Sequence, residues 1–462
     1  LNADTIDYIL DHSESKLLFV GKLDGWSEIQ KGIPKDMPCI SFPLAPPNDY
    51  ETWDSIVEKT EPIEGNPNRN KEEPAIIVYT SGSTGRPKGV MHSFEAIAAA
   101  AEGGETIFQA TPNDRMLSYL PLAHVFERAC VETLSLRSGL QIFFAESLDT
   151  FVQDLNRARP TIFVSVPRLW LKFQLGVFQK MPPEKLARLI RIPLLNRVIK
   201  KKILTGLGLQ EVRLAASGSA PIPPDLIQWY RELGLEVLEG YGMSDDFAYS
   251  HATQPGMSRA GYVGNPMPGV DVKISEEGEI LIKSPATMMG YYKQPELTAE
   301  CYTEDGYFKT GDRGERDEKG RLKITGRVKE LFKTSKGKYV APAPIENLLN
   351  NHPEVELCCV TGSGNPQPYA LILPAEELRP KLGDPAERER FENELNALLK
   401  SVNEEVEAFE RLGFLVVVKD AWAIENGFLT PTMKIKRSAI EDNYGPQSEG
   451  WYGAGKRIIW EA

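Results

Sequence analysis

A short run of glycine, serine, threonine and lysine residues has the composition of a phosphate-binding loop. It reads Y-T-S-G-S-T-G-R-P-K-G at residues 79–89, after the strand-like run P-A-I-I-V-Y and before the helix-like run A-I-A-A-A-A. The pattern predicts a strand, a loop and then a helix. Glycines let backbone N–H groups turn toward an anion, and hydroxyls and an ammonium add donors. We expect phosphate contacts from Thr80, Ser81, Gly82, Ser83, Thr84, Gly85 and Lys88.

The same composition is common in ordinary surface turns, and the run is not a Walker loop because it lacks a final Gly-Lys-Ser/Thr. As a whole, however, the string resembles the signature loop of the adenylate-forming enzymes, which include acyl-CoA synthetases, luciferases and nonribosomal adenylation domains. This resemblance implies that ATP is a substrate and that an acyl-adenylate is the first product.

Two further motifs match the same family in the expected order, A-A-S-G-S-A-P at residues 215–221 and E-G-Y-G-M-S-D-D at residues 239–246. The resemblance implies that Tyr241 stacks on adenine, that Ser244 meets the α-phosphate, and that Asp245 holds Mg²⁺ together with Thr84. The other residues expected at the nucleotide are Gly218, Ser219, Ala220, Pro221, Glu239, Gly240, Gly242 and Met243. A plain turn and a core aromatic are the structural alternatives.

The metal ligand departs from the family pattern. Asp245 stands where the family usually has glutamate, so its carboxylate is one methylene shorter. We therefore expect Mg²⁺ to be reached through a water, with Asp246 as a candidate helper.

The segments around residue 326 and near the C-terminus supply the remaining nucleotide contacts by resemblance. Y-F-K-T-G-D ends at Asp312, which would accept hydrogen bonds from both ribose hydroxyls, and Arg327 would support the same sugar. Lys329 falls at the family's hinge. L-T-P-T-M-K-I-K-R at residues 429–437 matches the terminal K-I-x-R, which makes Lys434 the catalytic lysine. Without the upstream motifs, all these residues would be interpreted as solvated charges.

Three sequence segments predict the residues that bind the acyl group and CoA. L-P-L-A-H-V-F-E-R at residues 120–128 and V-S-V-P-R-L-W at residues 164–170 resemble the fatty-acyl branch of the family. They place His124 and Val166 beside the acyl pocket and make Trp170 its gate, although a buried tryptophan is as often plain core. S-K-G-K-Y at residues 335–339 would line the CoA tunnel with Lys336 and Gly337.

Element patterns predict an α/β protein of two domains. Strands and helices alternate from residue 74 to residue 239, which favours mainly parallel sheets covered by helices on both faces. After residue 261 the strands are short, and V-D-V-K-I-S-E-E-G-E-I-L-I predicts a hairpin. We expect a large domain at 1–326 with a small β subdomain at 261–326. A mobile α+β domain at 327–462 would turn about Lys329.

The composition of the chain limits the classes of binding partner and cellular location that we expect. The chain has 462 residues and a net charge of −12, which argues against nucleic acid as a partner. Five cysteines without a C-x-x-C pair favour reduced thiols and a cytoplasmic protein, and neither an export signal nor a membrane span is expected. The basic, apolar segment at residues 186–204 could touch anionic lipid or CoA phosphates, although such a helix is usually a solvated face. The family normally begins with about a hundred further residues, so we expect either a fragment or a naturally short chain.

Together these features predict a long-chain fatty acid:CoA ligase that uses ATP, Mg²⁺ and CoA. Two alternatives remain at this point, an adenylate-forming enzyme that serves a carrier protein and a catalytically impaired nucleotide-binding homologue. A homodimer and a peripheral contact at the inner face of the membrane are both open.

Overall fold

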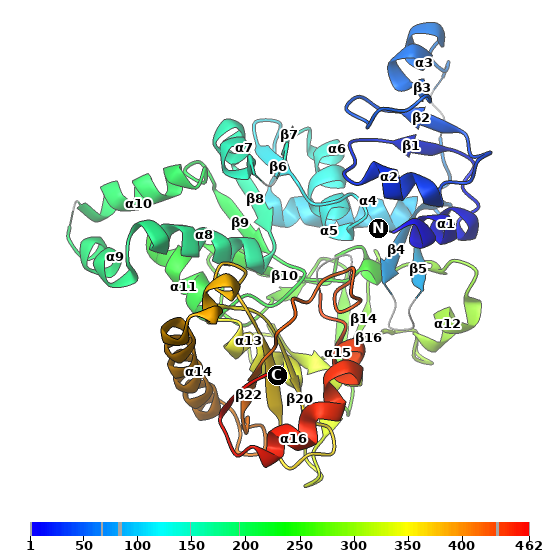
Figure 1. Cartoon of the computed structure of the whole chain (residues 1–462). Helices are drawn as coiled ribbons and strands as arrows, with labels where there is room; N and C mark the ends of the chain where they lie inside the picture. Colours follow the sequence, from blue (N-terminus) through cyan, green and yellow to red (C-terminus); the bar gives the residue numbers. More distant parts are fainter. Residues whose placement is uncertain are drawn as a thin grey trace. The chain divides into compact units, whose positions relative to one another are not determined.

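The computed structural model describes residues 2–65, 68–81, 86–147, 149–193, 195–430 and 434–461, with the side chain of Ser81 left out (Figure 1). Compactness divides the chain into two units. Unit 1 comprises Leu1–Ala98 with Ala286–Glu300, and unit 2 comprises Ala99–Pro285 with Cys301–Ala462. This division does not follow the predicted boundary after residue 326, so that boundary stays a prediction.

Unit 1 contains two small three-stranded sheets. The first is parallel, in the order β1-β2-β3. Two helices of the unit begin at side-chain caps: Oδ1 of Asn2 accepts from the backbone N–H of Thr5, and Oγ1 of Thr52 accepts from that of Ser55. The second is antiparallel, in the order β15-β5-β4. The elements of unit 1 are α1 (Ala3–His12), β1 (Leu18–Val20), α2 (Trp26–Ile29), β2 (Cys39–Ser41), β3 (Glu51–Thr52), α3 (Trp53–Lys59), β4 (Pro74–Ser81), β5 (Pro87–Ser93), β15 (Gly290–Tyr291) and α12 (Pro295–Glu300).

The predicted strand and helix are confirmed as β4 and α4 (Phe94–Phe108), but a strand that the pattern did not predict, β5, precedes the helix. β4 is followed by this second strand, which pairs antiparallel with it, and α4 begins only after β5. Proline and glycine at the start of this segment disfavour a helix, and V-M in the middle suits a strand. Gly89 is needed there, because a Cβ would lie 2.8 Å from Cγ2 of Ile77. β4 and β5 therefore pair antiparallel on either side of the predicted phosphate loop, and the described chain after residue 85 enters a strand before it reaches a helix.

Unit 2 contains a five-stranded sheet in the order β12-β11-β10-β9-β8. β8 to β10 are parallel, as the alternation predicts, and β11 and β12 are antiparallel additions. A separate parallel pair, β6 with β7, lies in the same unit. The strands are β6 (Arg115–Ser118), β7 (Gln141–Phe144), β8 (Ile162–Ser165), β9 (Leu214–Ser217), β10 (Val237–Tyr241), β11 (His251–Ala252) and β12 (Asn265–Pro266).

Helices between these strands bury an aromatic core against the sheet. Phe163, Trp170 and Tyr230 lie at its centre, and each is 1% exposed or less. The helices are α5 (Val125–Glu127), a π-helical turn at Arg128–Thr133, α6 (Leu134–Ser138), α7 (Phe151–Ala158), α8 (Pro167–Lys180), α9 (Pro183–Ile190), α10 (Leu195–Gly206) and α11 (Pro224–Leu233).

A four-stranded antiparallel sheet follows, in the order β13-β14-β16-β17. The predicted hairpin is confirmed, because β13 (Asp271–Ile274) pairs with β14 (Glu279–Lys283) around Gly278, whose φ is +82°. β16 (Phe308–Arg316) pairs with β17 (Leu322–Arg327), and this register sets Asp312 opposite Arg327.

The last part of unit 2 is a four-stranded sheet in the order β20-β21-β22-β23, with apolar clusters on both faces. Cys358 belongs to one cluster and Cys359 to the other, as the two-residue period of a strand requires. No described helix is long and apolar enough to cross a membrane. The elements are β18 (Phe332–Lys333), β19 (Tyr339–Val340), α13 (Pro342–Leu349), β20 (Val355–Thr361), β21 (Tyr369–Pro374), α14 (Pro385–Glu405), β22 (Leu415–Val417), α15 (Arg437–Tyr444), α16 (Ser448–Gly453) and β23 (Ile458–Trp460).

Candidate active site

Three predicted nucleotide residues from three strands meet in unit 2. The phenol of Tyr241, at the end of β10, donates a hydrogen bond of 2.7 Å to Oδ2 of Asp312 on β16. Nε of Arg327, opposite on β17, donates to Oδ1 of the same carboxylate at 2.9 Å. Burial, and then the charge of Asp312, raise the pKa of Tyr241 well above its usual value, so the phenol stays protonated and able to donate.

The turn after β10 is built around a buried carboxylate. Asp246 is fully buried, and its Oδ1 accepts backbone hydrogen bonds from Met243 at 2.8 Å and from Tyr249 at 3.2 Å. Gly242 lies under the same turn, where a Cβ would come within 2.5 Å of the backbone of Ala248. Asp246 therefore holds the turn together through Oδ1, and its suggested assistance to a metal ion stays a prediction.

Asp245 and Ser244 lie on the short 3-10 turn Ser244–Asp246, and both are partly exposed. No group of three or more His, Cys, Asp or Glu side chains in the described residues could hold a metal ion. Mg²⁺ is usually held by one or two carboxylates, with waters and substrate phosphates filling the rest of its shell. A single accessible carboxylate such as Asp245 fits that donor set.

Glu239 is the buried acid of β10. Its Oε2 accepts from the backbone N–H of Gly261 at 3.2 Å, and burial raises its pKa to about 8. At neutral pH this side chain is therefore largely uncharged, which suits a wall beside a polyanionic nucleotide.

The turn after β9 carries a backbone strain. Ser219 has a φ of +68°, a conformation that residues other than glycine rarely adopt. Gly218 before it faces the ring of Phe126, which a Cβ would approach to 3.3 Å. Ala220 and Pro221 are exposed. The turn of residues 215–221 and the segment of residues 120–128 are thus brought into contact, although more than eighty residues separate them.

His124 caps α5, and its Nδ1 accepts from the backbone N–H of Phe126 at 3.2 Å. Burial, and then the charge of Lys434, lower its pKa, so the imidazole is neutral at physiological pH. Burial, and then Arg327, lower the pKa of Lys434, while Asp312 opposes them. The surrounding protein desolvates the ammonium of Lys434, although the residue as a whole keeps an exposed surface. These mutual effects place Lys434 in the same electrostatic neighbourhood as His124, Arg327 and Asp312.

Arg437, a residue for which the sequence motifs predict no role, anchors the chain three residues after Lys434. Thr430 and Lys434 exchange two hydrogen bonds, from Lys434 N to Thr430 Oγ1 at 3.0 Å and from Thr430 N to Lys434 O at 2.8 Å. Residues 431–433 lie outside the described structure. Arg437 then begins α15, and its Nη2 donates to both carboxylate oxygens of Glu346 on α13, at 2.7 and 2.9 Å.

Arg437 also connects to the segment after the predicted hinge. Its Nη2 lies 3.7 Å from Oε2 of Glu330, and its Nη1 donates to the carbonyl of Val360 at 2.8 Å. Burial opposes the charge of Arg437, but Glu346 and Glu330 more than compensate and raise its pKa. The final arginine of K-I-x-R is the sequence signal that could have pointed to this anchor.

Val166 and Trp170 lie at the start of α8, where Val166 is the N-cap residue. Trp170 has no exposed surface and packs edge-on against Phe163 and Tyr230, at centroid distances of 5.2 and 4.9 Å. Its indole Nε1 has no hydrogen-bond partner among the described residues. The structure places Trp170 in the core behind β8, and its role as a gate stays a prediction.

The predicted phosphate loop belongs to unit 1. Gly82, Ser83, Thr84 and Gly85 lie outside the described residues, as does the side chain of Ser81. Thr80, the residue before the last of β4, pairs with Lys88 on β5, and the ammonium of Lys88 lies 5.2 Å from the ring centroid of Tyr291. The roles of all these residues stay predictions.

The predicted hinge and CoA residues are exposed. Lys329 lies in a 3-10 turn, Val328–Glu330, directly after β17. Lys336 and Gly337 form the turn between β18 and β19, where Gly337 has a φ of +79° and donates to the carbonyl of Thr334 at 2.9 Å. The geometry fits a hinge and a glycine loop, and neither function is tested by it.

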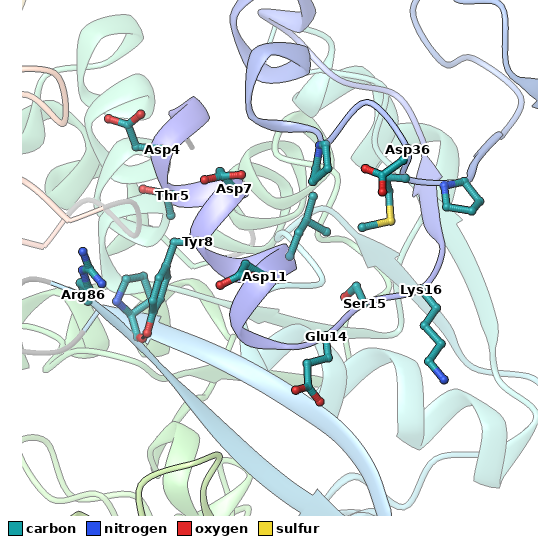
Figure 2. Close-up of a pocket in the computed structure, with 15 residues that line it drawn as sticks. Asp4, Thr5, Asp7, Tyr8, Asp11, Glu14, Ser15, Lys16, Asp36 and Arg86 are labelled. Carbon is teal, nitrogen blue, oxygen red and sulfur yellow. Dashed lines mark hydrogen bonds between the residues drawn. The ribbon is translucent and has the colours of Figure 1, made fainter.

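A hollow of about 1020 Å³ lies in unit 1 between α1, residues 34–38 and the start of β5 (Figure 2). Five of its lining residues are acidic, and only Lys16 and Arg86 are basic. Figure 2 shows Arg86 beside Tyr8, and the guanidinium lies 5.3 Å from the ring centroid. An acidic lining repels phosphates and carboxylates, so we do not assign a substrate to this hollow.

Sequence comparison identifies the class of protein that these strands and residues define. The chain belongs to the AMP-binding enzyme family, which it matches over residues 1–292, and it matches the AMP-binding enzyme C-terminal domain over residues 330–455. It is similar to the long-chain-fatty-acid–CoA ligase FadD15 of Mycobacterium tuberculosis, with 29% identity over 497 residues that cover 98% of this chain and 82% of that protein. It is also similar to human long-chain-fatty-acid–CoA ligase 1, with 30% identity over 522 residues that cover 98% of this chain and 74% of that protein.

Solved structures support the same fold. The adenylation domain of a carboxylate reductase from Mycobacterium chelonae superposes with a TM-score of 0.78 at 22% identity, covering 98% of this chain and 75% of that one. The corresponding domain from Segniliparus rugosus, in complex with AMP and a co-purified carboxylic acid, gives a TM-score of 0.77 at 23% identity, covering 98% and 77%. At these identities the likeness concerns the fold alone.

Proposed function

We propose that this chain is a long-chain fatty acid:CoA ligase that forms an acyl-adenylate from ATP. One observation carries the proposal. Tyr241 and Arg327 bind the carboxylate of Asp312, and Lys434 interacts electrostatically with Asp312, Arg327 and His124, in a chain whose relatives are named long-chain-fatty-acid–CoA ligases.

In the first half-reaction, a carboxylate oxygen of the fatty acid attacks the α-phosphorus of ATP, and pyrophosphate leaves. Asp312 would hold the ribose hydroxyls, and Tyr241 and Arg327 fix that carboxylate. Lys434 would stabilise the negative charge that develops on the phosphoryl and bridging oxygens. A polyanion near Lys434 favours its charged form, which offsets the lowering of its pKa by burial and Arg327.

In the second half-reaction, the CoA sulfur attacks the acyl carbonyl, AMP leaves, and the thiol proton passes to solvent. Neutral His124 beside Lys434 would line the acyl end of the site without adding charge. Lys336 and Gly337 would border the path of CoA. The first half-reaction needs Lys434 beside the acyl carboxylate and the α-phosphate, and the second needs an open path for CoA to the same acyl group. We therefore include in the proposal a rotation of the C-terminal domain about Lys329 between the two half-reactions.

Magnesium belongs to the proposal as well. Asp245 would hold it, and the second predicted ligand, Thr84, lies outside the described residues. When bound, the ion neutralises phosphate charge and orients the polyphosphate.

The proposal is tested by supplying ATP, Mg²⁺ and fatty acids of twelve to eighteen carbons, with and without CoA. Pyrophosphate release and acyl-CoA are measured separately. A ligase gives a CoA-dependent thioester in amounts that match the AMP formed. Pyrophosphate without any thioester would instead indicate transfer to a carrier protein, and the absence of both products would indicate a nucleotide-binding homologue without this activity. Acetate and an amino acid serve as control substrates.

A further inference from the structure

An ion pair joins the first turn of α8 to β20. Nη2 of Arg168 donates to Oε1 of Glu356 at 2.8 Å, although 188 residues separate the two along the chain. α8 belongs to the family domain that matches residues 1–292, and β20 belongs to the C-terminal domain that matches residues 330–455. Both elements lie in unit 2. The pair is therefore a direct link between the two family domains within one compact unit.

Glu356 is oriented for this contact by a second arginine. Nη2 of Arg379 binds the other carboxylate oxygen, Oε2, and Nε of Arg379 donates to the carbonyl of Pro374 at 3.0 Å. These three residues all belong to the C-terminal domain. The side chain of Glu356 is 16% exposed, whereas that of Arg168 is 52% exposed. The C-terminal domain thus presents a fixed acceptor, and Arg168 reaches it from outside that domain.

The first turn of α8 gives its side chains different surroundings. Trp170 is fully buried in the aromatic core of unit 2, whereas Arg168, two residues earlier, lies at the surface. Residues two apart on a helix do not share a face. Within the described part of the chain, Glu356 is the acid that pairs with Arg168. The predicted acyl segment is therefore connected to β20 through Arg168 and to the core through Trp170.

β20 also anchors the chain beside Lys434. The carbonyl of Val360, four residues after Glu356 on the same strand, accepts from Nη1 of Arg437 at 2.8 Å. The charge of Lys434, three residues before Arg437, lowers the pKa of His124, which lies in the segment before the hinge. A contact that holds β20 against α8 therefore also holds Lys434 near His124.

We propose that Arg168 and Glu356 are positioning residues that hold Lys434 in place for adenylate formation. The inference rests on the proposed function, in which the C-terminal domain rotates about Lys329 between the half-reactions. Arg168 precedes this hinge and Glu356 follows it, so the rotation would separate their charges. Because the pair forms in the arrangement that brings Lys434 to the site, it favours that arrangement over the one that admits CoA.

The exposure of the pair sets the size of this effect. A partly exposed ion pair changes an equilibrium by roughly 1.5- to 5-fold, because water screens the attraction. A preference of this size changes the balance between two domain arrangements and still allows the rotation in every turnover. A surface ion pair without any function is the alternative that the experiment has to reject.

The test measures the two half-reactions separately in variants of Arg168. Adenylate formation is followed by pyrophosphate exchange with a fatty acid of twelve to eighteen carbons, and thioester formation is started from supplied acyl-adenylate and CoA. Arg168→Gln should slow adenylate formation about threefold, and Arg168→Glu about fivefold or more, because two acids then face each other. Thioester formation should be unchanged or faster. Arg168→Lys keeps the charge and should retain most of the parent rate.

The matched control is Lys172→Glu. Lys172 is an exposed cation four residues farther along α8, so this variant makes the same charge change on the same helix. It should resemble the parent in both half-reactions, and equal thermal melting shows that all variants are folded. If Arg168→Glu slows neither half-reaction, or slows both equally, the positioning role is overturned.

A cycle of double and single variants tests whether the two residues act as a pair. Arg168→Gln/Glu356→Gln should form adenylate no more slowly than the slower single variant, whereas independent residues would give multiplied losses. Multiplied losses overturn the proposal while the parent remains an active ligase. A parent that forms no adenylate at all would refute the proposed function itself, so the two failures are distinguished by the parent protein.

Discussion

Tyr241 donates a 2.7 Å hydrogen bond to Oδ2 of Asp312, while Oδ1 of the same carboxylate accepts from Arg327 at 2.9 Å. A carboxylate oxygen can accept two hydrogen bonds, so both oxygens can still take a hydroxyl. The acceptor is thus oriented in the absence of a nucleotide.

Asp312→Ala is expected to raise the KM for ATP by about tenfold or more, because each lost charge-assisted hydrogen bond is worth roughly 1.5–3 kcal/mol. The KM for the fatty acid should change little. Steady-state kinetics with each substrate varied in turn decide this, with Asp305→Ala, an exposed acid of the same subdomain, as the control. A change confined to the fatty acid KM would contradict the ribose role.

Lys434→Ala is expected to slow adenylate formation by about 10²-fold or more, since the lost interaction acts mainly in the transition state. Thioester formation from supplied acyl-adenylate should survive. Lys436→Ala, two residues on and also exposed, is the matched control. Undiminished pyrophosphate exchange in the Lys434 variant would refute the assignment.

Trp170→Ala is expected to lengthen or broaden the range of accepted acyl chains. Because the ring is fully buried against Phe163 and Tyr230, the same change should also cost about 3–5 kcal/mol of folding stability. Trp170→Phe keeps more of the packing and allows the profile to be measured on a folded enzyme. Tyr230→Phe, which removes only a hydrogen bond to the carbonyl of Trp170, is the control. A profile like that of the parent in both Trp170 variants would leave this residue a core residue alone.

Lys329→Pro is expected to reduce thioester formation far more than adenylate formation. Proline fixes φ near about −65° and removes a donor, so a turn about the 3-10 segment Val328–Glu330 would be restricted. Lys329→Ala keeps the backbone free and should resemble the parent. The two half-reactions are measured separately, and equal losses in both would reject alternation about this residue.

Glu239 makes stability depend on pH. Burial raises its pKa from 4.5 to about 8, so the folded state holds a proton that the unfolded chain releases. Its stabilising contribution is complete below pH 4.5 and is lost as the pH rises through about 8. In Glu239→Gln, the midpoint of urea unfolding should decline less over this pH range. Glu236 is a partly exposed neighbour, and Glu236→Gln should show the same decline as the parent. Parallel curves for the parent and Glu239→Gln would show that this carboxyl is not the cause.

Local patterns predicted what depends on neighbours in sequence. β4, the strands from β6 to β10, the β13–β14 hairpin and the family motifs follow from alternation, turn residues and short strings. β5 was missed because proline and glycine interrupt its short apolar run, and a helix follows so closely. The structural role of Asp246 depends on which way a carboxylate turns, and the pair of Arg437 with Glu346 joins residues far apart in sequence. No local pattern encodes either.

The link from Arg437 to Glu346 and Glu330 also has an entropic consequence. Ordering a backbone residue costs about 1–2 kcal/mol, and immobilising a lysine side chain adds to this. Because Arg437 is bound to Val360, Glu346 and Glu330, its own ordering accompanies folding. A nucleotide that binds beside Lys434 then does not bear the cost of ordering Arg437, three residues farther along the chain.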